Sequence, residues 1–200
     1  MIAVKRTVAA KSRLTAVLSE AARARLVETM LRHVLSATEA STHVHEILVV
    51  SSQHRRTATP SITVIDDACD LNAAFGAGAR IAAARGHRTA LLLPADLPFV
   101  TAQDLDALIE AADVVGVALA SDRIGVGTNA LCLPLKLPIC LAFGSESRVR
   151  HVTALEDAGF SPTLIDRPGF ALDIDVVKDL DRLRDISEYR FLGHLRRSTA

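Results

Sequence analysis

Three aspartates stand where the pattern of the chain predicts that strands end. Asp96 follows a run of three leucines. Asp173 and Asp175 alternate with apolar residues, which places both on one face of an extended segment. In open α/β sheets, ligands bind beyond the carboxyl ends of the strands. Neighbouring carboxylates repel unless a cation lies between them, and oxygen ligands suit Mg²⁺ bound together with substrate phosphates. The three acids therefore predict a magnesium site.

An ordinary structural role is also open to two of these acids. Asp96 could cap the helix predicted to begin near Thr101, and Asp175 could cap the helix predicted over residues 176–186. Thr101 and Asp104, however, already supply a capping signature for the first of these helices. The metal interpretation is therefore favoured for Asp96, whereas both interpretations stay open for Asp175.

Basic and glycine-rich segments could bind an anion. Residues 5–14 carry four cations after a short apolar strand, and they could form either a solvated loop or a phosphate cradle. The glycines of residues 121–129 can bring backbone N–H groups close to an anion. Residues 143–147 open a predicted helix whose first amides would favour phosphate or carboxylate. In that segment Ser145 or Ser147 could equally be an ordinary N-cap.

The sequence motifs of several other common enzyme chemistries are absent. The sequence has no G-x-S-x-G elbow and no phosphate loop of the G-x-x-x-x-G-K-[ST] type. The three cysteines lack metal-type spacing and indicate reduced thiols in a cytosolic protein. His43 and His45 could form a metal pair, but solvated histidines at a strand start are the favoured interpretation. Metal-assisted phosphoryl or nucleotidyl transfer is the chemistry that uses the acids, the cations and the loops together.

The elements that must position these residues alternate along the chain. Strands are expected at residues 1–4, 47–50, 61–65, 91–93, 114–119 and 130–133, and a short one between Pro162 and Pro168. Helices are expected at 19–37, 73–84, 101–111, 148–158 and 176–186. Asp70 or Asn72 can cap the second helix. This alternation is typical of one α/β domain with a largely parallel sheet. We expect that domain over residues 1–187 and a polar, frayed tail over 188–200.

Length and charge limit the partners. Two hundred residues fit one domain with a substantial core. The 23 acidic and 23 basic residues balance, so no net electrostatic attraction favours binding to nucleic acid or to an anionic membrane. No apolar run reaches the roughly 18–20 residues of a membrane helix, and Lys5 and Arg6 interrupt any signal-peptide core. A cytoplasmic protein is expected, and its Ala/Leu-rich composition permits a homodimer.

Several segments together resemble the CofC/FbiD family, the guanylyltransferases of deazaflavin coenzyme F-420 biosynthesis. They follow the family's order and spacing from Val4 to about Leu183. The segments are Val4-Lys5, Ala10–Leu14, Leu71–Ala74, Leu93–Pro98, Gly127–Leu131, Phe143-Gly144, Ser147, Arg150-His151, Pro168-Gly169 and Ala171–Asp175. None of these segments is diagnostic alone, but the combination is specific.

The resemblance implies both a fold and a reaction. The fold would be a single three-layer α/β domain with a mostly parallel mixed sheet of the GT-A type, related to MobA-like nucleotidyltransferases. The reaction would transfer GMP from GTP to a three-carbon phospho-acid and release pyrophosphate. The acceptors of the family are 2-phospho-L-lactate, phosphoenolpyruvate and 3-phospho-D-glycerate.

The resemblance also implies roles for individual residues. Asp96, Asp173 and Asp175 would hold Mg²⁺, Thr128, Gly144 and Ser147 would contact the acceptor, Lys5, Lys11 and Arg13 would meet the GTP phosphates, and Asn72 would lie on the nucleotide side. We expect Asp96, Lys5 and Arg13 to be the catalytic residues. The acceptor phosphate is already anionic and needs no strong general base. We therefore expect His151 to be structural or to face the acceptor.

The chain departs from the family pattern at two places. Family members usually begin with several more residues and have a proline at the position of Ala3. Either the true start therefore lies upstream, or the floor of the nucleotide pocket is thin. Ser145-Glu146 replaces the commoner Pro-Gly, and Glu146 adds a negative charge beside an anionic substrate. Two alternatives stay open: a related MobA-like transferase for another nucleotide or a phospho-sugar, and a catalytically silent nucleotide-binding module.

Overall fold

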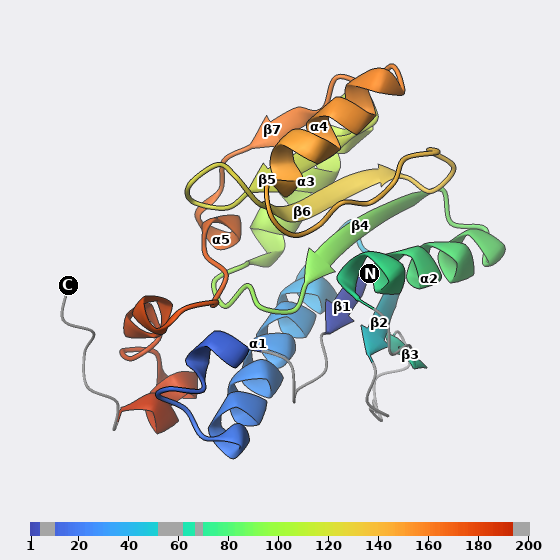
Figure 1. The fold of residues 1–200 in the computed structure, drawn as a ribbon. Helices are drawn as coiled ribbons and strands as arrows, with labels where there is room; N and C mark the ends of the chain where they lie inside the picture. Colours follow the sequence, from blue (N-terminus) through green and yellow to red (C-terminus); the bar gives the residue numbers. More distant parts are fainter. Residues whose placement is uncertain (5–10, 52–61, 67–69, 194–200) are drawn as a thin grey trace.

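Strands and helices alternate along most of the chain (Figure 1). A computed structural model describes residues 1–4, 11–51, 62–66 and 70–193. The strands are β1 (Ile2–Val4), β2 (Ile47–Ser51), β3 (Ile62–Asp66), β4 (Thr89–Pro94), β5 (Ala118–Ser121), β6 (Thr128–Pro134) and β7 (Thr163–Ile165). The α-helices are α1 (Glu20–Ala40), α2 (Leu71–Ala84), α3 (Ala102–Val115), α4 (Ser147–Asp157) and α5 (Pro168–Ala171). Three 3₁₀ helices are η1 (Ser12–Leu14), η2 (Val177–Arg182) and η3 (Ser187–Leu192).

The described strands form one seven-stranded sheet in the order β3-β2-β1-β4-β6-β5-β7. β1 pairs in parallel with β2 and β4, β2 with β3, and β5 with β7. β6 runs antiparallel to both of its neighbours, β4 and β5. The expected mostly parallel mixed sheet is therefore confirmed. The carboxyl ends of β1 and β4 lie together because these two strands are parallel neighbours.

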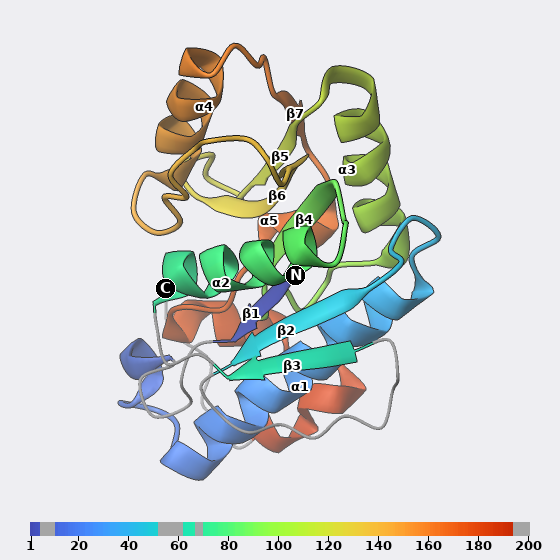
Figure 2. The same ribbon diagram turned by 90° about the vertical axis from the view of Figure 1, so that its right-hand side faces the viewer.

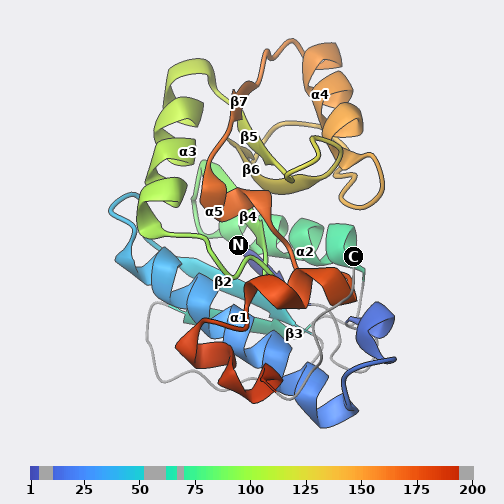
Figure 3. The same cartoon turned by 90° about the vertical axis from the view of Figure 1, so that its left-hand side faces the viewer.

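Helices cover both faces of this sheet, which gives the three expected layers. In Figures 2 and 3, α1 and α3 lie on one side of the sheet, and α2 and α4 lie on the other. Ile2 and Val4 of β1 point into the core cluster that includes α1 and α3, whereas Ala3 belongs to the cluster with α2 and α4. The alternation of strand side chains thus builds two apolar cores, one on each face.

The predicted helix starts at three positions are confirmed by their caps. The Ser19 hydroxyl accepts a hydrogen bond from Ala22 N, and Asp70 accepts from the amides of Asn72 and Ala73. Thr101 and Asp104 form a complete capping box at the start of α3. Because Thr101 caps this helix, Asp96 is not needed as its cap.

The strand predicted over residues 114–119 begins too early. Val114 and Val115 are the last residues of α3, and these residues are 83% and 44% exposed. Gly116 closes the helix with φ 93°, a left-handed value that favours glycine, and β5 starts only at Ala118. Two β-branched residues at an exposed helix end therefore gave a misleading strand pattern.

The helix predicted over residues 176–186 is also wrong in type. The segment forms the 3₁₀ helix η2, which ends at Arg182. Its start is fixed by the Asp179 carboxylate, which accepts hydrogen bonds from the amides of Asp175 and Val176. Asp179, rather than Asp175, is therefore the capping side chain. This frees the Asp175 carboxylate to face the end of β4.

Residues beyond 187 still pack against the core. Tyr189 and Leu192 of η3 are buried in the core cluster on the α1 side, and the Arg25 guanidinium stacks 4.4 Å from the Phe191 ring centroid. Tyr189, Phe191 and Leu192 belong to the segment expected to be a polar tail. Within the described ranges, none of the helices has both the length and the hydropathy that crossing a bilayer requires.

Candidate active site

The three predicted metal ligands meet beyond the carboxyl end of β4. Asp96 lies two residues beyond the end of β4, whereas Asp173 and Asp175 lie in the extended segment after α5. Each offers one carboxylate oxygen, and these three oxygens lie within 4.8 Å of one another. In the described part of the chain, no other group of His, Cys, Asp or Glu residues brings three such ligand atoms together. The structure therefore assembles the acids that the sequence singled out.

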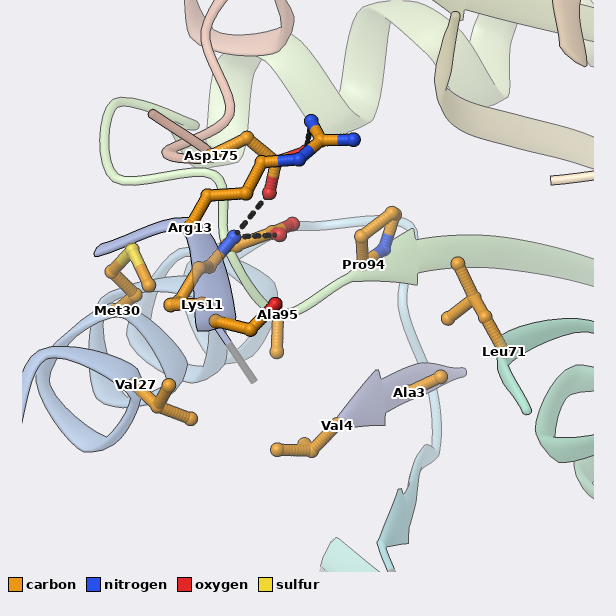
Figure 4. A pocket seen from close by; sticks show the side chains of 12 residues that line it. Ala3, Val4, Lys11, Arg13, Val27, Met30, Leu71, Pro94, Ala95 and Asp175 are labelled. Carbon is orange, nitrogen blue, oxygen red and sulfur yellow. Dashed lines mark hydrogen bonds and ion pairs between the residues drawn. The ribbon is translucent and has the colours of Figure 1, made fainter. Parts of the chain in front are cut away.

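Lys11 lies inside this acidic cluster. Its Nζ is 2.6 Å from Asp96 Oδ2 and 3.0 Å from Asp175 Oδ1, and its side chain is only 6% exposed. Figure 4 shows the Lys11 side chain directed at Asp175, with dashed lines for the contacts of its Nζ. Burial opposes the charged form, but the carboxylates of Asp96 and Asp175 outweigh it and raise the Lys11 pKa. The buried cation thus balances part of the negative charge.

Other cations of the amino-terminal segment are farther from the cluster or undescribed. Arg13 Nη1 lies 4.0 Å from Asp175 Oδ2, and the Arg13 side chain is 72% exposed. Lys5 lies outside the described residues. Lys11 precedes η1 with φ 57°, a left-handed value that costs a non-glycine residue some backbone energy. This turn aims the Lys11 side chain back at the sheet edge.

The environment of Asp173 disfavours a charge when no cation is bound. Burial, followed by the charges of Asp96 and Asp175, raises its pKa to about 6, and Lys11 only partly opposes this shift. A divalent cation would reverse this balance because all three donors are hard carboxylate oxygens. The Lys11 ammonium already serves as a cation between Asp96 and Asp175. By its donor chemistry and charge, the site fits Mg²⁺.

Two pockets share the acidic edge. The first, here called the Lys11 pocket, has a volume of about 240 Å³ and is lined by Ala3, Val4, Lys11, Ser12, Arg13, Val27, Met30, Leu71, Pro94, Ala95, Asp96 and Asp175 (Figure 4). The second, the Thr128 pocket, measures about 450 Å³. Asp96 and Asp175 line both pockets, and Arg13 does so too. Groups bound in the two pockets would therefore meet at the aspartates.

The Thr128 pocket contains the three predicted acceptor contacts, Thr128, Gly144 and Ser147. Gly144 adopts φ 123°, which requires glycine in practice. Ser147 is the first residue of α4, and its Oγ accepts a hydrogen bond from Thr128 N over 2.8 Å. The proposed N-cap role of Ser145 or Ser147 is wrong, because Glu146 occupies that position and makes no side-chain cap.

Asn72 supports the Thr128 pocket from behind. Its side-chain Oδ1 accepts from Phe143 N over 2.7 Å, and its Nδ2 donates to Phe143 O over 3.1 Å. Asn72 lines neither the Lys11 pocket nor the Thr128 pocket. Its expected contact with the nucleotide stays a prediction, whereas its observed bonds hold the loop before Gly144.

The hydrogen bonds of His151 and Asn129 could not be predicted from the sequence. The His151 ring is fully buried, with Nδ1 2.9 Å from Thr128 Oγ1 and Nε2 accepting from Ala142 N over 2.9 Å. Asn129 donates to Phe170 O over 2.8 Å and ties β6 to α5. The Thr-Asn pair after a glycine-rich loop was the available signal, but its partners lie 23 and 41 residues away.

His43, a possible half of a histidine metal pair by its sequence position, pairs with Glu110 and does not belong to the acidic cluster. Its Nε2 is 3.3 Å from Glu110 Oε1, in a partly exposed pair. The favoured interpretation of a solvated histidine agrees with this position.

Comparison with known proteins gives concordant matches. A sequence model of the family described as "Guanylyl transferase CofC like" matches residues 1–194. The chain is 38% identical over 191 residues to a phosphoenolpyruvate guanylyltransferase of Chloroflexus aggregans, covering 92% of this chain and 93% of that protein. It is 38% identical over 190 residues to a 3-phospho-D-glycerate guanylyltransferase of Phenylobacterium zucineum, covering 90% and 86%.

Solved structures share the fold at low sequence identity. A putative nucleotide-diphospho-sugar transferase from Desulfovibrio desulfuricans G20 superposes with a TM-score of 0.74 at 14% identity, covering 96% of this chain and 92% of that one. A nucleotidyl transferase from Methanothermobacter thermautotroptrophicus gives a TM-score of 0.62 at 19% identity, covering 95% and 96%. These likenesses confirm the expected fold class.

Proposed function

The chain belongs to the family of CofC-like guanylyl transferases, and from this membership we propose that it transfers GMP from GTP to a three-carbon phospho-acid. One structural observation carries the proposal. Asp96 and Asp175 line two adjoining pockets, and a cationic segment lies on one side of them. Such an arrangement lets a nucleoside triphosphate and a second phosphate compound meet at one set of carboxylates.

We assign the metal site to Asp96, Asp173 and Asp175, whose carboxylate oxygens fit Mg²⁺. When bound there, the ion would supply positive charge against the negative charge that develops during phosphoryl transfer. Lys11 and Arg13 add two further cations from the amino-terminal segment. Lys11 would exchange its present carboxylate partners for phosphate oxygens, which are equally good acceptors of its hydrogen bonds.

The reaction needs positioning more than it needs proton transfer. An oxygen of the acceptor phosphate forms a bond to the α-phosphorus of GTP, and the bond from that phosphorus to the bridging oxygen of the β-phosphate breaks. Pyrophosphate leaves with the bonding electrons. Because the attacking oxygen is already anionic, alignment of the two polyanions and neutralisation of their charge are what the protein must provide. His151 is fully buried with both ring nitrogens engaged, so it does not act as a base.

We assign the acceptor to the Thr128 pocket, where Thr128, Gly144 and Ser147 are its proposed contacts. The two relatives named above act on phosphoenolpyruvate and on 3-phospho-D-glycerate. For this chain we propose these two acids, together with 2-phospho-L-lactate, as the acceptors to test. Glu146 also lines the pocket and places a carboxylate near any anionic acceptor. A homodimer and a cytoplasmic location stay predictions.

One assay tests the proposed function. The protein is incubated with GTP, Mg²⁺ and each of the three phospho-acids in turn, and the products are identified by mass spectrometry. A guanylylated phospho-acid and an equal amount of pyrophosphate are expected with at least one acceptor. ATP and CTP in place of GTP serve as controls for the base. Absence of product with all three acceptors would rule out the proposed function.

A further inference from the structure

His151 in α4 makes a hydrogen bond through each of its two ring nitrogens. Its imidazole is fully buried between β6 and the loop that precedes α4. Nε2 lies 2.9 Å from Ala142 N, and Nδ1 lies 2.9 Å from Thr128 Oγ1. Neither ring nitrogen therefore reaches into the Thr128 pocket. Any effect of His151 on a ligand of that pocket must pass through one of its two partners.

The first partner decides which ring nitrogen carries the hydrogen. A backbone N–H can only donate, so Nε2 must be the unprotonated acceptor of the bond from Ala142. The hydrogen of the neutral ring then lies on Nδ1 and is donated to Thr128 Oγ1. A charged ring would set two N–H groups against each other at Ala142. Burial, and then the charge of Arg150, lower the His151 pKa to about 4, in agreement with a neutral ring.

The second partner, the Thr128 hydroxyl, is oriented by the ring in turn. Because the Thr128 hydroxyl accepts the hydrogen of Nδ1, its own hydrogen must be donated elsewhere. Ser147 is in the same position, because its hydroxyl accepts the backbone hydrogen of Thr128. Among residues 1–4, 11–51, 62–66 and 70–193, neither hydroxyl donates a hydrogen bond. Both residues line the Thr128 pocket, so an acceptor bound there can receive the hydrogen of each hydroxyl.

The surroundings of His151 keep these donors in place. Phe143 packs edge-on against the imidazole, with ring centroids 4.8 Å apart and an interplanar angle of 69°. Asn72 holds the backbone of Phe143 through two hydrogen bonds. The ring thereby links the start of β6, the loop before α4 and α4 itself. Small displacements of a donor weaken a hydrogen bond steeply, so such anchoring matters for binding.

We propose that His151 is a positioning residue that commits the Thr128 hydroxyl to donation and, together with Ser147, makes the pocket select a carboxylate on the acceptor. The proposal rests on the proposed function, which places the acceptor in the Thr128 pocket. The acceptor phosphate must face the aspartates shared with the Lys11 pocket. The other anionic group of the acceptor, its carboxylate, is then left for the two hydroxyls. Two donors match a carboxylate, whereas a neutral hydroxyl group would gain less from them.

Four variants test this role. His151→Phe keeps an aromatic ring beside Phe143 but removes both hydrogen bonds. His151→Asn can place an amide N–H near the position of Nδ1 and so keeps the donor to Thr128. Thr128→Val removes the hydroxyl, and the double variant His151→Phe/Thr128→Val closes a double-mutant cycle. KM and kcat are measured for GTP and for the best acceptor. Turnover of glycerol 3-phosphate, which has a hydroxymethyl group where 3-phospho-D-glycerate has a carboxylate, is measured beside them.

The proposal gives a specific pattern of effects. His151→Phe raises the acceptor KM about tenfold, the usual scale for weakening a hydrogen bond to a charged group. It leaves the GTP KM within about twofold, a change worth far less than one hydrogen bond. His151→Asn recovers most of the loss. In the Thr128→Val background, His151→Phe has little further effect, because the hydroxyl through which it acts is gone. The preference for 3-phospho-D-glycerate over glycerol 3-phosphate falls in His151→Phe and in Thr128→Val alike.

Other patterns would overturn the proposal. An unchanged acceptor KM in His151→Phe would remove His151 from acceptor binding. Equal increases in the KM of GTP and of the acceptor would indicate a merely structural role, as would fully additive losses in the double variant. If His151→Phe does not fold by circular dichroism, His151→Asn and Thr128→Val still decide the matter. The proposal then requires that Thr128→Val loses carboxylate preference and that His151→Asn retains it.

Failure of the proposed function can be told apart from failure of this inference. If the wild-type protein makes no product with any of the three acceptors, the proposed function fails, and the inference fails with it unless phosphoenolpyruvate still binds. Calorimetric titration of phosphoenolpyruvate into the wild type and His151→Phe covers that case. Equal affinities, or no binding to either, would refute the role of His151. Normal wild-type turnover with unaltered variants would refute the inference alone.

Discussion

The Lys11 ammonium lies 2.6 Å from Asp96 Oδ2, at the edge of the sheet where two pockets adjoin. It also reaches Asp175, so one buried cation holds two carboxylates that lie in different parts of the chain. Without it, three acids would face one another with less compensation. We therefore regard Lys11 as a counterion of the metal-free protein as well as a proposed ligand of GTP.

Replacing Lys11 by Met should make the protein more responsive to Mg²⁺. The variant keeps an unbranched side chain one atom shorter than lysine but removes the buried charge that compensates the acids. Without a divalent cation, the variant should lose roughly 1–3 kcal/mol of unfolding free energy. This is less than the cost of breaking a fully buried ion pair, because the Asp175 side chain is half exposed. Adding Mg²⁺ should then raise its melting temperature more than that of the wild type. Calorimetry with and without Mg²⁺ measures both effects, and the exposed Arg13→Met is the control. Equal magnesium-induced shifts in Lys11→Met and the wild type would contradict this account.

Asp96→Asn should abolish transfer without unfolding the protein. Asp96 lines both pockets just beyond the end of β4, and its carboxylate is a member of the proposed metal site. Loss of a charge that stabilises the transferring group should lower kcat by at least about 100-fold. Pyrophosphate release gives the rate, and circular dichroism checks the fold. Asp157→Asn, at the exposed end of α4, should behave as the wild type. Normal turnover in Asp96→Asn would remove Asp96 from the metal site.

Gly169 should tolerate no side chain. A Cβ atom at this position would overlap Asp104 Oδ2 and would lie 2.9 Å from Val100 Cα. Asp104 cannot move away freely, because it caps α3 and pairs with Arg167 over 2.9 Å. Gly169→Ala should therefore cost about 1–3 kcal/mol of unfolding free energy in urea titrations.

The matched control for Gly169→Ala has the opposite sign. Gly76 lies inside α2, and among the described residues a Cβ atom there would meet only Arg80 Nη1, at 3.8 Å. Gly76→Ala should therefore stabilise the protein by about 0.5–1 kcal/mol, because alanine favours a helix more than glycine does. A similar free energy of unfolding for the two alanine variants would show that the Gly169 site can relax.

His151 should make the protein less stable in mild acid. Its pKa in the folded protein is about 4 because of burial and, secondarily, the charge of Arg150, whereas the ordinary value is 6.5. The unfolded chain therefore takes up a proton first, and stability is lost as the pH falls from about 6.5 towards 4. The loss could reach about 2–3 kcal/mol, since one pKa unit corresponds to about 1.4 kcal/mol.

Urea titrations at about pH 7 and about pH 5 measure this acid sensitivity. The free energy of unfolding should fall more in the wild type than in His151→Asn, which has no imidazole to protonate. The same fall in both proteins would mean that other groups control the acid response.

Local patterns in the sequence predicted much of the fold and the acidic site. Asp96 was found because a buried strand ends before it, and Asp173 and Asp175 because they alternate with apolar residues. The caps at Ser19, Asp70 and Thr101 were read from a few neighbouring residues each. Local patterns also caused the errors. Val114 and Val115 have a strand-like character but end a helix, and the segment after Asp175 forms 3₁₀ turns where an α-helix was predicted.

The sequence by itself determined which residues carry charge, which strands are buried and that three carboxylates stand near strand ends. Those properties depend on residues that are close along the chain. The tertiary structure alone decided that Lys11 pairs with Asp96, 85 residues away, and that Asn72 holds Phe143, 71 residues away. It also decided that His151 orients the Thr128 hydroxyl. Hydrogen bonds and ion pairs act over a few ångströms, so they exist only after the sheet and its helices bring distant segments together.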